Sequence, residues 1–189
     1  MSLLAVLLAF VQPSAHRFLC AAAMILSSFG DIVLMNFKGI GARMSVPYFY
    51  VGAGFFILAH IVYACSFLYR IRQNGYPYLN AGFMTAAVLV LLAWIALTVF
   101  AFRKGRIDWV MYGLCFVYMC IIGLNCATIF SFAFSAGGWY LLAAAGALSF
   151  FVSDLIIGAD KLAGISTPAL QNGIWWFYPI GQILIILFG

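Results

Sequence analysis

Long apolar stretches alternate with short polar connections along the whole chain. A helix needs about 20 predominantly apolar residues to cross the hydrocarbon core of a bilayer, and stretches of roughly that length recur. We therefore predict membrane-spanning helices at residues 18–35, 47–68, 79–102, 109–134, 139–157 and 168–188. A further apolar stretch, residues 1–11, reaches only about 16 Å as a helix. Counting it, the pattern predicts an all-α, polytopic membrane bundle of about seven segments, in a single domain over residues 1–189.

The connections between these stretches carry turn and capping signals. Asn74-Gly75 is a strong turn signal between the second and third spans. Before the last span, Ser166 or Thr167 can cap a helix that has Pro168 at its first position. Pro179 falls inside that helix and is expected to bend it.

Composition supports a membrane protein and excludes some partners. The chain is 67% hydrophobic and 7% charged, whereas soluble domains are about one quarter charged. The net charge of +5 comes from residues in short connections, which favours lipid headgroups over nucleic acid as the partner.

Basic residues also suggest an orientation. Six of them fall on the side of Met1 and three on the other side, which predicts that the Met1 side is cytoplasmic, in the inner membrane if the protein is bacterial. The first group is Lys38, Arg43, Arg103, Lys104, Arg106 and Lys161, and the second is Arg17, Arg70 and Arg72.

Two carboxylates stand inside apolar runs. The chain has four acidic residues, all of them Asp, and Asp31 in "ILSSFGDIVLM" and Asp154 in "LSFFVSDLIIG" repeat one arrangement. They fall on the second and sixth predicted segments, an even step of four, so both helices are predicted to run in the same direction. Each Asp lies three or four residues before its predicted span ends, toward the predicted cytoplasmic side. Ionisable groups in spans usually face a bundle interior or a wet cavity. The alternatives are a structural hydrogen bond between helices and a position close enough to the lipid headgroups to stay hydrated.

Several neutral polar side chains share helix faces that can reach these carboxylates. Spacings of three, four or seven residues place two side chains on one face of a helix. The set comprises His60 with Tyr63, Tyr178 with Gln182, Tyr118 with Asn125, and Ser27, which precedes Asp31 by four residues. The alternative interpretation is an interior histidine satisfied by its neighbours, an interfacial tyrosine and a packing glutamine.

Two carboxylates favour acid–base chemistry. A catalytic zinc ion usually has three protein ligands, commonly histidine, but the chain has two His, and His16 falls beside Arg17 in a predicted loop. No cofactor or metal is expected, although an Asp/Asp/His site stays open. A carboxyl group kept neutral by apolar surroundings can donate a proton, while an ionised one stabilises a cation or activates water. Glycoside hydrolysis uses one carboxyl group as the proton donor and the other as the base or nucleophile. Hydrolysis of a vinyl ether needs the same two roles.

The polar pattern resembles the YhhN family of membrane proteins, which includes lysoplasmalogenases. The resemblance rests on "GDIVL" at 30–34, "FFILAHIVY" at 55–63, "SDLIIGADK" at 153–161 and "YPIGQILI" at 178–185. It implies hydrolysis of the vinyl ether bond of lysoplasmalogens, giving a fatty aldehyde and a glycerophospho-ethanolamine or -choline. By matching motifs, Asp31 and Asp154 are implied to be catalytic. His60, Tyr63, Tyr178 and Gln182 are implied to line the site.

The resemblance brings one departure and one further residue. The family pattern has eight membrane helices, and the opening "MSLLAVLLAF" resembles the second of them in a shortened form, so the first is expected to be missing here. Lys161, seven residues beyond Asp154, is expected to meet the phosphate of a lysophospholipid substrate at the membrane face.

Two other classes of function compete with hydrolysis. Intramembrane carboxylates also serve proton-coupled transport, which predicts proton-coupled flux without a product. A non-catalytic membrane scaffold predicts that Asp-to-Asn changes at both positions are silent.

Overall fold

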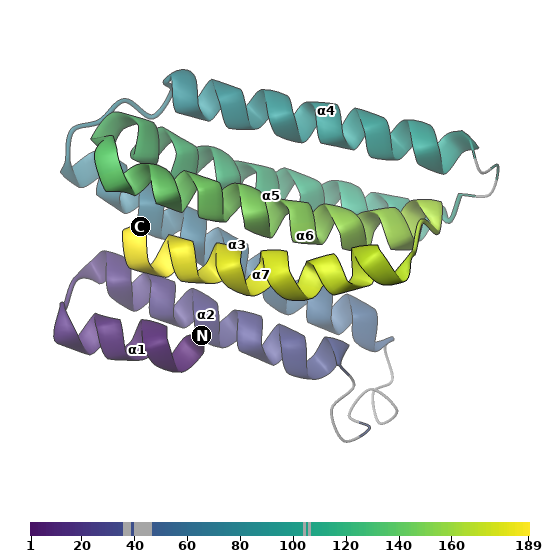
Figure 1. The fold of residues 1–189 in the computed structure, drawn as a ribbon, viewed down its shortest axis with the longest axis horizontal. Coiled ribbons are helices and arrows are strands. Elements are labelled where there is room, and N and C mark those ends of the chain that lie inside the picture. Colours follow the sequence, from purple (N-terminus) through teal and green to yellow (C-terminus); the bar gives the residue numbers. More distant parts are fainter. Residues whose placement is uncertain (36–38, 40–46, 104, 106) are drawn as a thin grey trace. The chain divides into compact units, whose positions relative to one another are not determined.

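The chain is entirely helical in the computed structural model, which describes residues 1–35, 39, 47–103, 105 and 107–189. The described residues form seven α-helices and one short 3-10 helix (Figure 1). They are α1 (Ser2–Val11), α2 (Ala15–Leu34), α3 (Tyr48–Gln73), α4 (Ala81–Arg103), α5 (Trp109–Ala136), η2 (Gly138–Tyr140), α6 (Leu141–Ala163) and α7 (Pro168–Phe188).

Five helical segments are long and apolar enough to cross a membrane. They are α2, α3, α4, α5 and the stretch Gly138–Ala163, which joins η2 to α6. The N-terminal α1 is shorter, and α7 is not among the five. The predicted all-α membrane bundle is confirmed. By internal contacts the chain forms two compact units, Met1–Arg70 and Ile71–Gly189, which are described separately below; the single domain stays a prediction.

In the first unit, α2 begins earlier than predicted. The Ser14 side chain caps the helix by accepting a hydrogen bond from the Arg17 backbone N–H at 3.2 Å. The prediction that His16 lies in a loop is therefore wrong. His16 is a buried residue in the first turn, with its Nδ1 2.6 Å from the Ser66 hydroxyl and its ring edge-on to Phe67.

Small residues bring α2 and α3 together at the other end of that unit. A Cβ added at Gly30 would lie 2.7 Å from the Phe56 ring, and one at Gly52 would meet the Leu34 side chain. His16 therefore faces Ser66 while Leu34 faces Gly52, so the two helices are antiparallel. Alongside α2 lies α1, whose Ser2 hydroxyl donates to the Met24 carbonyl at 3.1 Å.

In the second unit, α4, α5, α6 and α7 run alongside one another in chain order (Figure 1). The backbones of α6 and α7 approach so closely that a Cβ at Gly181 would lie 2.8 Å from the Gly146 carbonyl oxygen. The connection between α5 and α6 is a tight turn in which Gly137 and Gly138 both have positive φ, a conformation that favours glycine. These contacts fix the register among α5, α6 and α7, and that register positions the candidate site.

The last two helices test the predicted boundaries. The span predicted to end at residue 157 is shorter than the helix. Helix α6 continues to Ala163 and is closed by Gly164 in the left-handed conformation. By contrast, α7 covers the predicted residues 168–188. Its first turn is capped by Thr167, which accepts from the Leu170 N–H at 3.3 Å, and the helix continues through Pro179.

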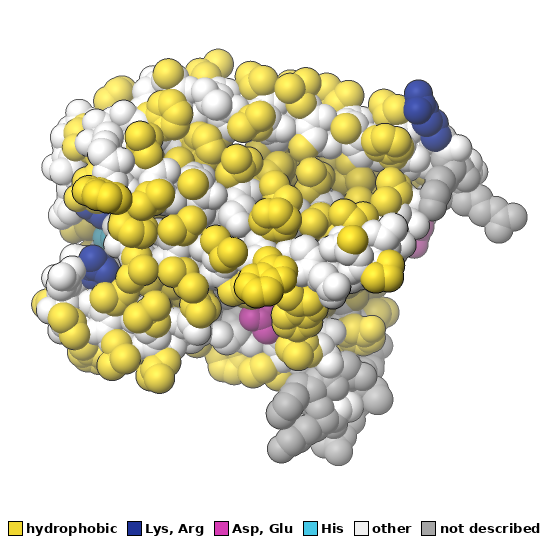
Figure 2. All heavy atoms as spheres, in the orientation of Figure 1, with side chains coloured by type: hydrophobic (Ala, Val, Ile, Leu, Met, Phe, Trp, Pro, Cys, Tyr) yellow, Lys and Arg dark blue, Asp and Glu magenta, His cyan; other side chains and the backbone are white. Residues whose placement is uncertain are grey.

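Hydrophobic side chains cover most of the face shown in Figure 2, and the Lys and Arg side chains visible there lie toward helix ends. This distribution is consistent with a multi-pass membrane protein. Four of the basic residues used to predict orientation, Lys38, Arg43, Lys104 and Arg106, lie outside the described residues. The orientation stays a prediction.

Candidate functional site

Asp154 is held by a tyrosine of the neighbouring helix. The Tyr118 hydroxyl on α5 donates a hydrogen bond to Oδ2 of Asp154 on α6 at 2.8 Å, and both side chains are partly buried. Because α5 and α6 are antiparallel and joined by the glycine turn, residues 36 apart in the chain stand at one level. The sequence named both residues but gave no reason to pair them.

Tyr178 lies one turn from Asp154 within the same unit. Its ring stands edge-on to Phe150, with the centroids 5.2 Å apart, and Phe150 precedes Asp154 by four residues on α6. The close approach at Gly181 sets this position, because a Cβ there would lie 2.7 Å from the Phe150 backbone nitrogen. The second unit thus brings Asp154 and Tyr118 to one level, with Tyr178 one turn away, and we call these three residues the carboxylate layer.

Two amides lie further along the same helices. Asn125 follows Tyr118 by seven residues, and Gln182 follows Tyr178 by four; both are buried. In the antiparallel register each stands near Ala147, about 10 Å along α6 from Asp154. The Asn125 backbone carbonyl also accepts a hydrogen bond from the Thr128 hydroxyl at 2.8 Å. A neutral polar layer therefore lies about two helical turns from the carboxylate layer.

The first unit has the same succession of a carboxylate and then neutral polar groups. Asp31 is partly buried, three residues before the end of α2. His60 and Tyr63 are fully buried on α3. Because Phe56 packs on Gly30 and the helices are antiparallel, His60 stands near Met24, about 10 Å along α2 from Asp31.

Ser27 is buried one turn before Asp31. Its hydroxyl has no hydrogen-bond partner among the residues that the structure describes. An unsatisfied buried hydroxyl carries a desolvation penalty, so Ser27 is a natural position for contact with a polar reactant or a water molecule.

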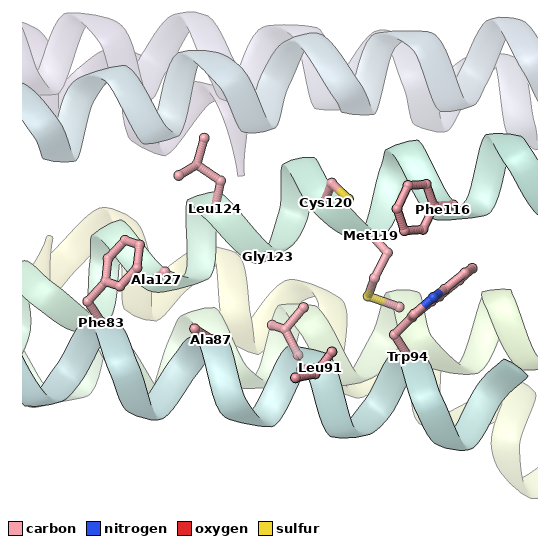
Figure 3. Close-up of a pocket in the computed structure, with 11 residues that line it drawn as sticks. Phe83, Ala87, Leu91, Trp94, Phe116, Met119, Cys120, Gly123, Leu124 and Ala127 are labelled. Atoms are coloured by element: carbon pink, nitrogen blue, oxygen red, sulfur yellow. The ribbon is translucent and has the colours of Figure 1, made fainter. Parts of the chain in front are cut away.

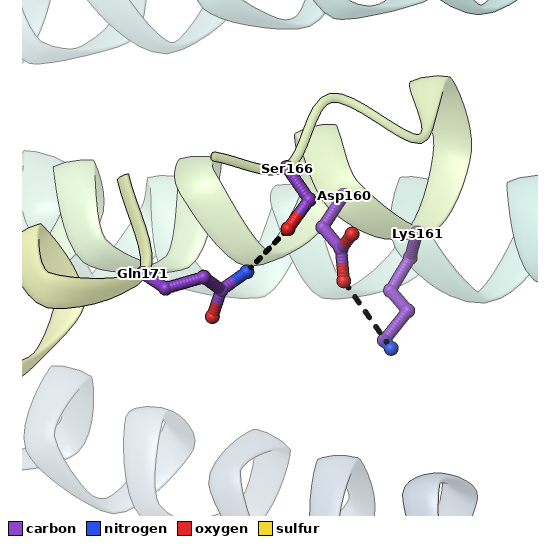
Figure 4. Close-up of polar contacts among 4 residues, drawn as sticks. All are labelled: Asp160, Lys161, Ser166 and Gln171. Atoms are coloured by element: carbon purple, nitrogen blue, oxygen red, sulfur yellow. Dashed lines mark hydrogen bonds and ion pairs between the residues drawn. The ribbon is translucent and has the colours of Figure 1, made fainter. Parts of the chain in front are cut away.

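Lys161 lies at the end of α6, seven residues beyond Asp154. Its side chain is 41% exposed and forms an ion pair with the neighbouring Asp160 at 3.4 Å. Beyond the turn, the Gln171 amide donates to the Ser166 hydroxyl at 3.0 Å (Figure 4). The Asp160 contact was missed by the sequence analysis, although adjacent residues of opposite charge were the signal for it.

A separate apolar groove of about 350 Å³ runs between α4 and α5. Figure 3 shows Trp94 and Leu91 of α4 and Phe116, Met119 and Leu124 of α5 along it. None of the site residues predicted from the sequence lines this groove. Its lining is almost entirely carbon, so it offers packing for hydrocarbon and no acid or base.

Metal ligation has no local support in the part of the chain that the structure describes. Among those residues no three His, Cys, Asp or Glu side chains gather as a metal site would require. The nearest approach to such a group is His16 with Cys20, whose sulfur lies 3.7 Å from Nε2. The sequence analysis passed over this buried pair because it placed His16 in a loop.

Long apolar helices with carboxylates inside them define a multi-pass helical membrane protein. The chain belongs to the YhhN family, which matches residues 1–188, and the resemblance seen in the motifs is thereby confirmed. That family includes lysoplasmalogenases. No curated protein and no solved structure matches the chain.

Proposed function

We propose that this protein is a lysoplasmalogenase, a membrane-embedded hydrolase that cleaves the vinyl ether bond of lysoplasmalogens. The observation that carries the proposal is the YhhN match over residues 1–188. Carboxylates at Asp31 and Asp154, each inside a candidate membrane span, support it because vinyl ether hydrolysis needs an acid and a base in a site of low polarity.

The proposed reaction begins with proton transfer to carbon. Asp31 gives its proton to the vinyl carbon distal to the ether oxygen, and the adjacent carbon becomes an oxocarbenium ion. Asp154 removes a proton from water as the water oxygen bonds to that cationic carbon. The resulting hemiacetal then collapses: its bond to the glycerol oxygen breaks, that oxygen takes up the proton held by Asp154, and the hemiacetal hydroxyl gives its proton back to Asp31 as the aldehyde forms. The products are a fatty aldehyde and a glycerophospho-ethanolamine or -choline.

The hydrogen bond from Tyr118 supports this assignment of roles. Asp154 Oδ2 acts as an acceptor toward that hydroxyl, which suits a carboxylate that receives a proton from water. Hydrogen bonding to a charged group is stronger than bonding to a neutral one. We therefore propose Asp154 as the base and Asp31 as the acid, with Tyr118 as a positioning residue for Asp154.

The remaining predicted site residues are proposed to bind the substrate. The neutral polar residues His60, Tyr63, Asn125 and Gln182 are buried, and Tyr178 and Ser27 lie one turn from Asp154 and Asp31, respectively. Lys161 is exposed at the helix end, where a lysophospholipid phosphate competes with Asp160 for its ammonium group. The lipid substrate is thus proposed to lie with its headgroup near Lys161.

The test is aldehyde release by the purified protein in nanodiscs. Three lysophospholipids that differ only in the chain linkage, alkenyl, alkyl and acyl, are compared, with and without EDTA. Aldehyde is expected from the alkenyl lipid alone, and none from a folded double variant, Asp31→Asn with Asp154→Asn. Absence of aldehyde from folded wild-type protein would overturn the proposal.

A proton-coupled transporter is the second candidate, and the Tyr118–Asp154 hydrogen bond also suits a proton relay. Transport predicts proton flux across liposomes in response to a solute, with no aldehyde. The same purified protein can be used for both measurements, so each candidate has its own positive result.

A further inference from the structure

Helix α7 changes character partway along its length. Its first half carries Gln171 and Asn172, and α7 is not among the helical segments apolar enough to cross a membrane throughout. From Trp175 onward its side chains are predominantly apolar. At the transition, Trp175 is 64% exposed and Trp176 is 70% exposed. Tryptophan is enriched where hydrocarbon meets headgroups.

This transition lies at the level of Asp154. On α6, Ile156 is 3.7 Å from a Cβ placed at Gly173, and Phe150 meets Gly181. In this antiparallel register Trp175 stands opposite Asp154, within about one residue. The distance along α6 from Asp154 to the helix end at Ala163 is about 13 Å.

Pro179 gives a second, independent indication. It lacks an N–H group and cannot donate to the Trp175 carbonyl, which stands four residues earlier in the helix. Loss of this usual helix donor is tolerated best where water can replace it, as in the headgroup layer. The first turn of α7 also makes a polar contact with the α6–α7 connection, because the Gln171 amide donates a hydrogen bond to the Ser166 hydroxyl (Figure 4).

The opposite face of the unit lacks this transition. Leu97 of α4 is 3.3 Å from a Cβ placed at Gly158, so Trp94 stands near the level of Leu155. Beyond that level α4 keeps apolar side chains on its surface, including Ile95, Val99 and Phe100. The apolar surface is therefore longer on the α4 face than on the α7 face.

We propose that the first two turns of α7, residues 168–174, lie in the phospholipid headgroup layer, and that Trp175 and Trp176 mark the local edge of the hydrocarbon core at the depth of Asp154. The partner is the glycerophosphate region of the bilayer. Water and headgroups reach further along α7 than along α4, which creates a local depression of the membrane surface. If the proposed function holds, the depression lets the ether bond of an upright lysoplasmalogen, just below its phosphate, meet Asp154 without the headgroup entering hydrocarbon.

Tryptophan fluorescence in nanodiscs tests the depth directly. One variant keeps Trp176 and replaces Trp94, Trp109, Trp139 and Trp175 with Phe; its matched control keeps Trp94 in the same way. Each is reconstituted with phosphatidylcholine that carries a quencher either near the headgroup or at mid-chain. We expect Trp176 to be quenched more by the headgroup label, with red-shifted emission, and Trp94 to be quenched more by the mid-chain label.

Mid-chain quenching of Trp176 equal to that of Trp94 would overturn the proposal. The measurement does not involve aldehyde, so its failure is distinct from failure of the proposed function. Absence of aldehyde from folded wild-type protein, with the depth pattern as expected, would remove the lysoplasmalogenase assignment and leave the membrane depression standing.

Thiol labelling provides a second measurement if the tryptophan variants do not fold. In a background with the five native cysteines replaced by Ala, Asn172→Cys is compared with Ala96→Cys, at the same level on α4. A charged maleimide is expected to react with the first in nanodiscs and to leave the second unmodified. Equal protection of both would also overturn the proposal.

Discussion

Asp31 and Asp154 have similar sequence surroundings but different structural settings. Asp31 comes three residues before the end of α2, next to Gly30, which receives the Phe56 ring. Asp154 comes nine residues before the end of α6 and accepts a hydrogen bond from Tyr118 across the helix pair. An apolar run around an Asp thus indicates an unusual carboxylate, while the neighbouring helix and the distance to the helix end determine how that carboxylate is used.

The largest expected effect comes from neutralising either carboxylate. Asp31→Asn and Asp154→Asn are each expected to lower aldehyde release by about 10²- to 10⁴-fold, the usual range for losing a general acid or base. Asp108→Asn is the control, because Asp108 caps the start of α5 and asparagine is an equally good cap. A loss confined to one of the two positions would show that the other carboxylate is structural.

An added methyl group is expected to lower stability more at Gly181, in the unit that holds Asp154, than at Gly30, next to Asp31. Gly181→Ala places a Cβ within 3 Å of backbone atoms of Gly146 and Phe150, so α6 and α7 must move apart. We expect a loss of about 1–3 kcal/mol in the free energy of unfolding, measured by thermal unfolding in detergent. Gly30→Ala meets mainly the Phe56 ring, which can shift, and should cost less.

Gly113→Ala is the control for this pair, since nothing lies within 4 Å of a Cβ there. It should leave stability unchanged or raise it by up to about 1 kcal/mol, because alanine favours helix more than glycine does. Equal destabilisation by all three changes would contradict the packing difference.

Removing the hydroxyl that distinguishes the Asp154 setting should have a smaller effect. Tyr118→Phe is expected to lower aldehyde release by about 10- to 150-fold, since hydrogen bonds to charged groups contribute roughly 1.5–3 kcal/mol. Tyr112→Phe is the matched control on α5; its hydroxyl lies 3.2 Å from that of Thr98. If both variants retain full activity, Tyr118 does not position Asp154 for the reaction.

The smallest expected effect on aldehyde release comes from a change in the first unit that should alter stability alone. Ser66→Ala removes the hydroxyl beside His16 and the bond to the His16 carbonyl at 3.0 Å. We expect a loss of about 1–3 kcal/mol in stability and unchanged aldehyde release. Thr85→Ala, whose hydroxyl bonds the Ala81 carbonyl within its own exposed helix turn, should be nearly silent. If Ser66→Ala lost activity while stability was unchanged, His16 and Ser66 would have a role in the reaction and not only in folding.

Helix number and type were predictable from the sequence because apolar runs of membrane length leave few alternatives. Helix ends were less so. The fifth predicted span stops at residue 157, before the charged "GADKLA", yet a helix can extend beyond the hydrocarbon, and α6 continues to Ala163, where Gly164 in the left-handed conformation closes it. Likewise, hydropathy alone excluded His16 from its span, whereas the Ser14 cap and the Ser66 contact place it inside α2.

The candidate site also combines features that the sequence predicts with features that it does not. Spacing along one helix placed Tyr118 with Asn125 and Tyr178 with Gln182, and it could do so because one-helix geometry is regular. The pairing of Tyr118 with Asp154 depends on the register between two helices, which the glycine turn and interhelical contacts determine. The site assignment itself stays a prediction.

The glycine turn at Gly137–Gly138 has a consequence for biogenesis. It joins α5 and α6 into a helical hairpin whose two members supply Tyr118 and Asp154. A hairpin that enters the bilayer as one piece carries the carboxylate together with its hydrogen-bond donor, which lowers the penalty of inserting Asp154. Two of the three residues of the carboxylate layer, Asp154 and Tyr118, are thus brought together before α7 has been synthesised, and α7 adds Tyr178 to a carboxylate already in place.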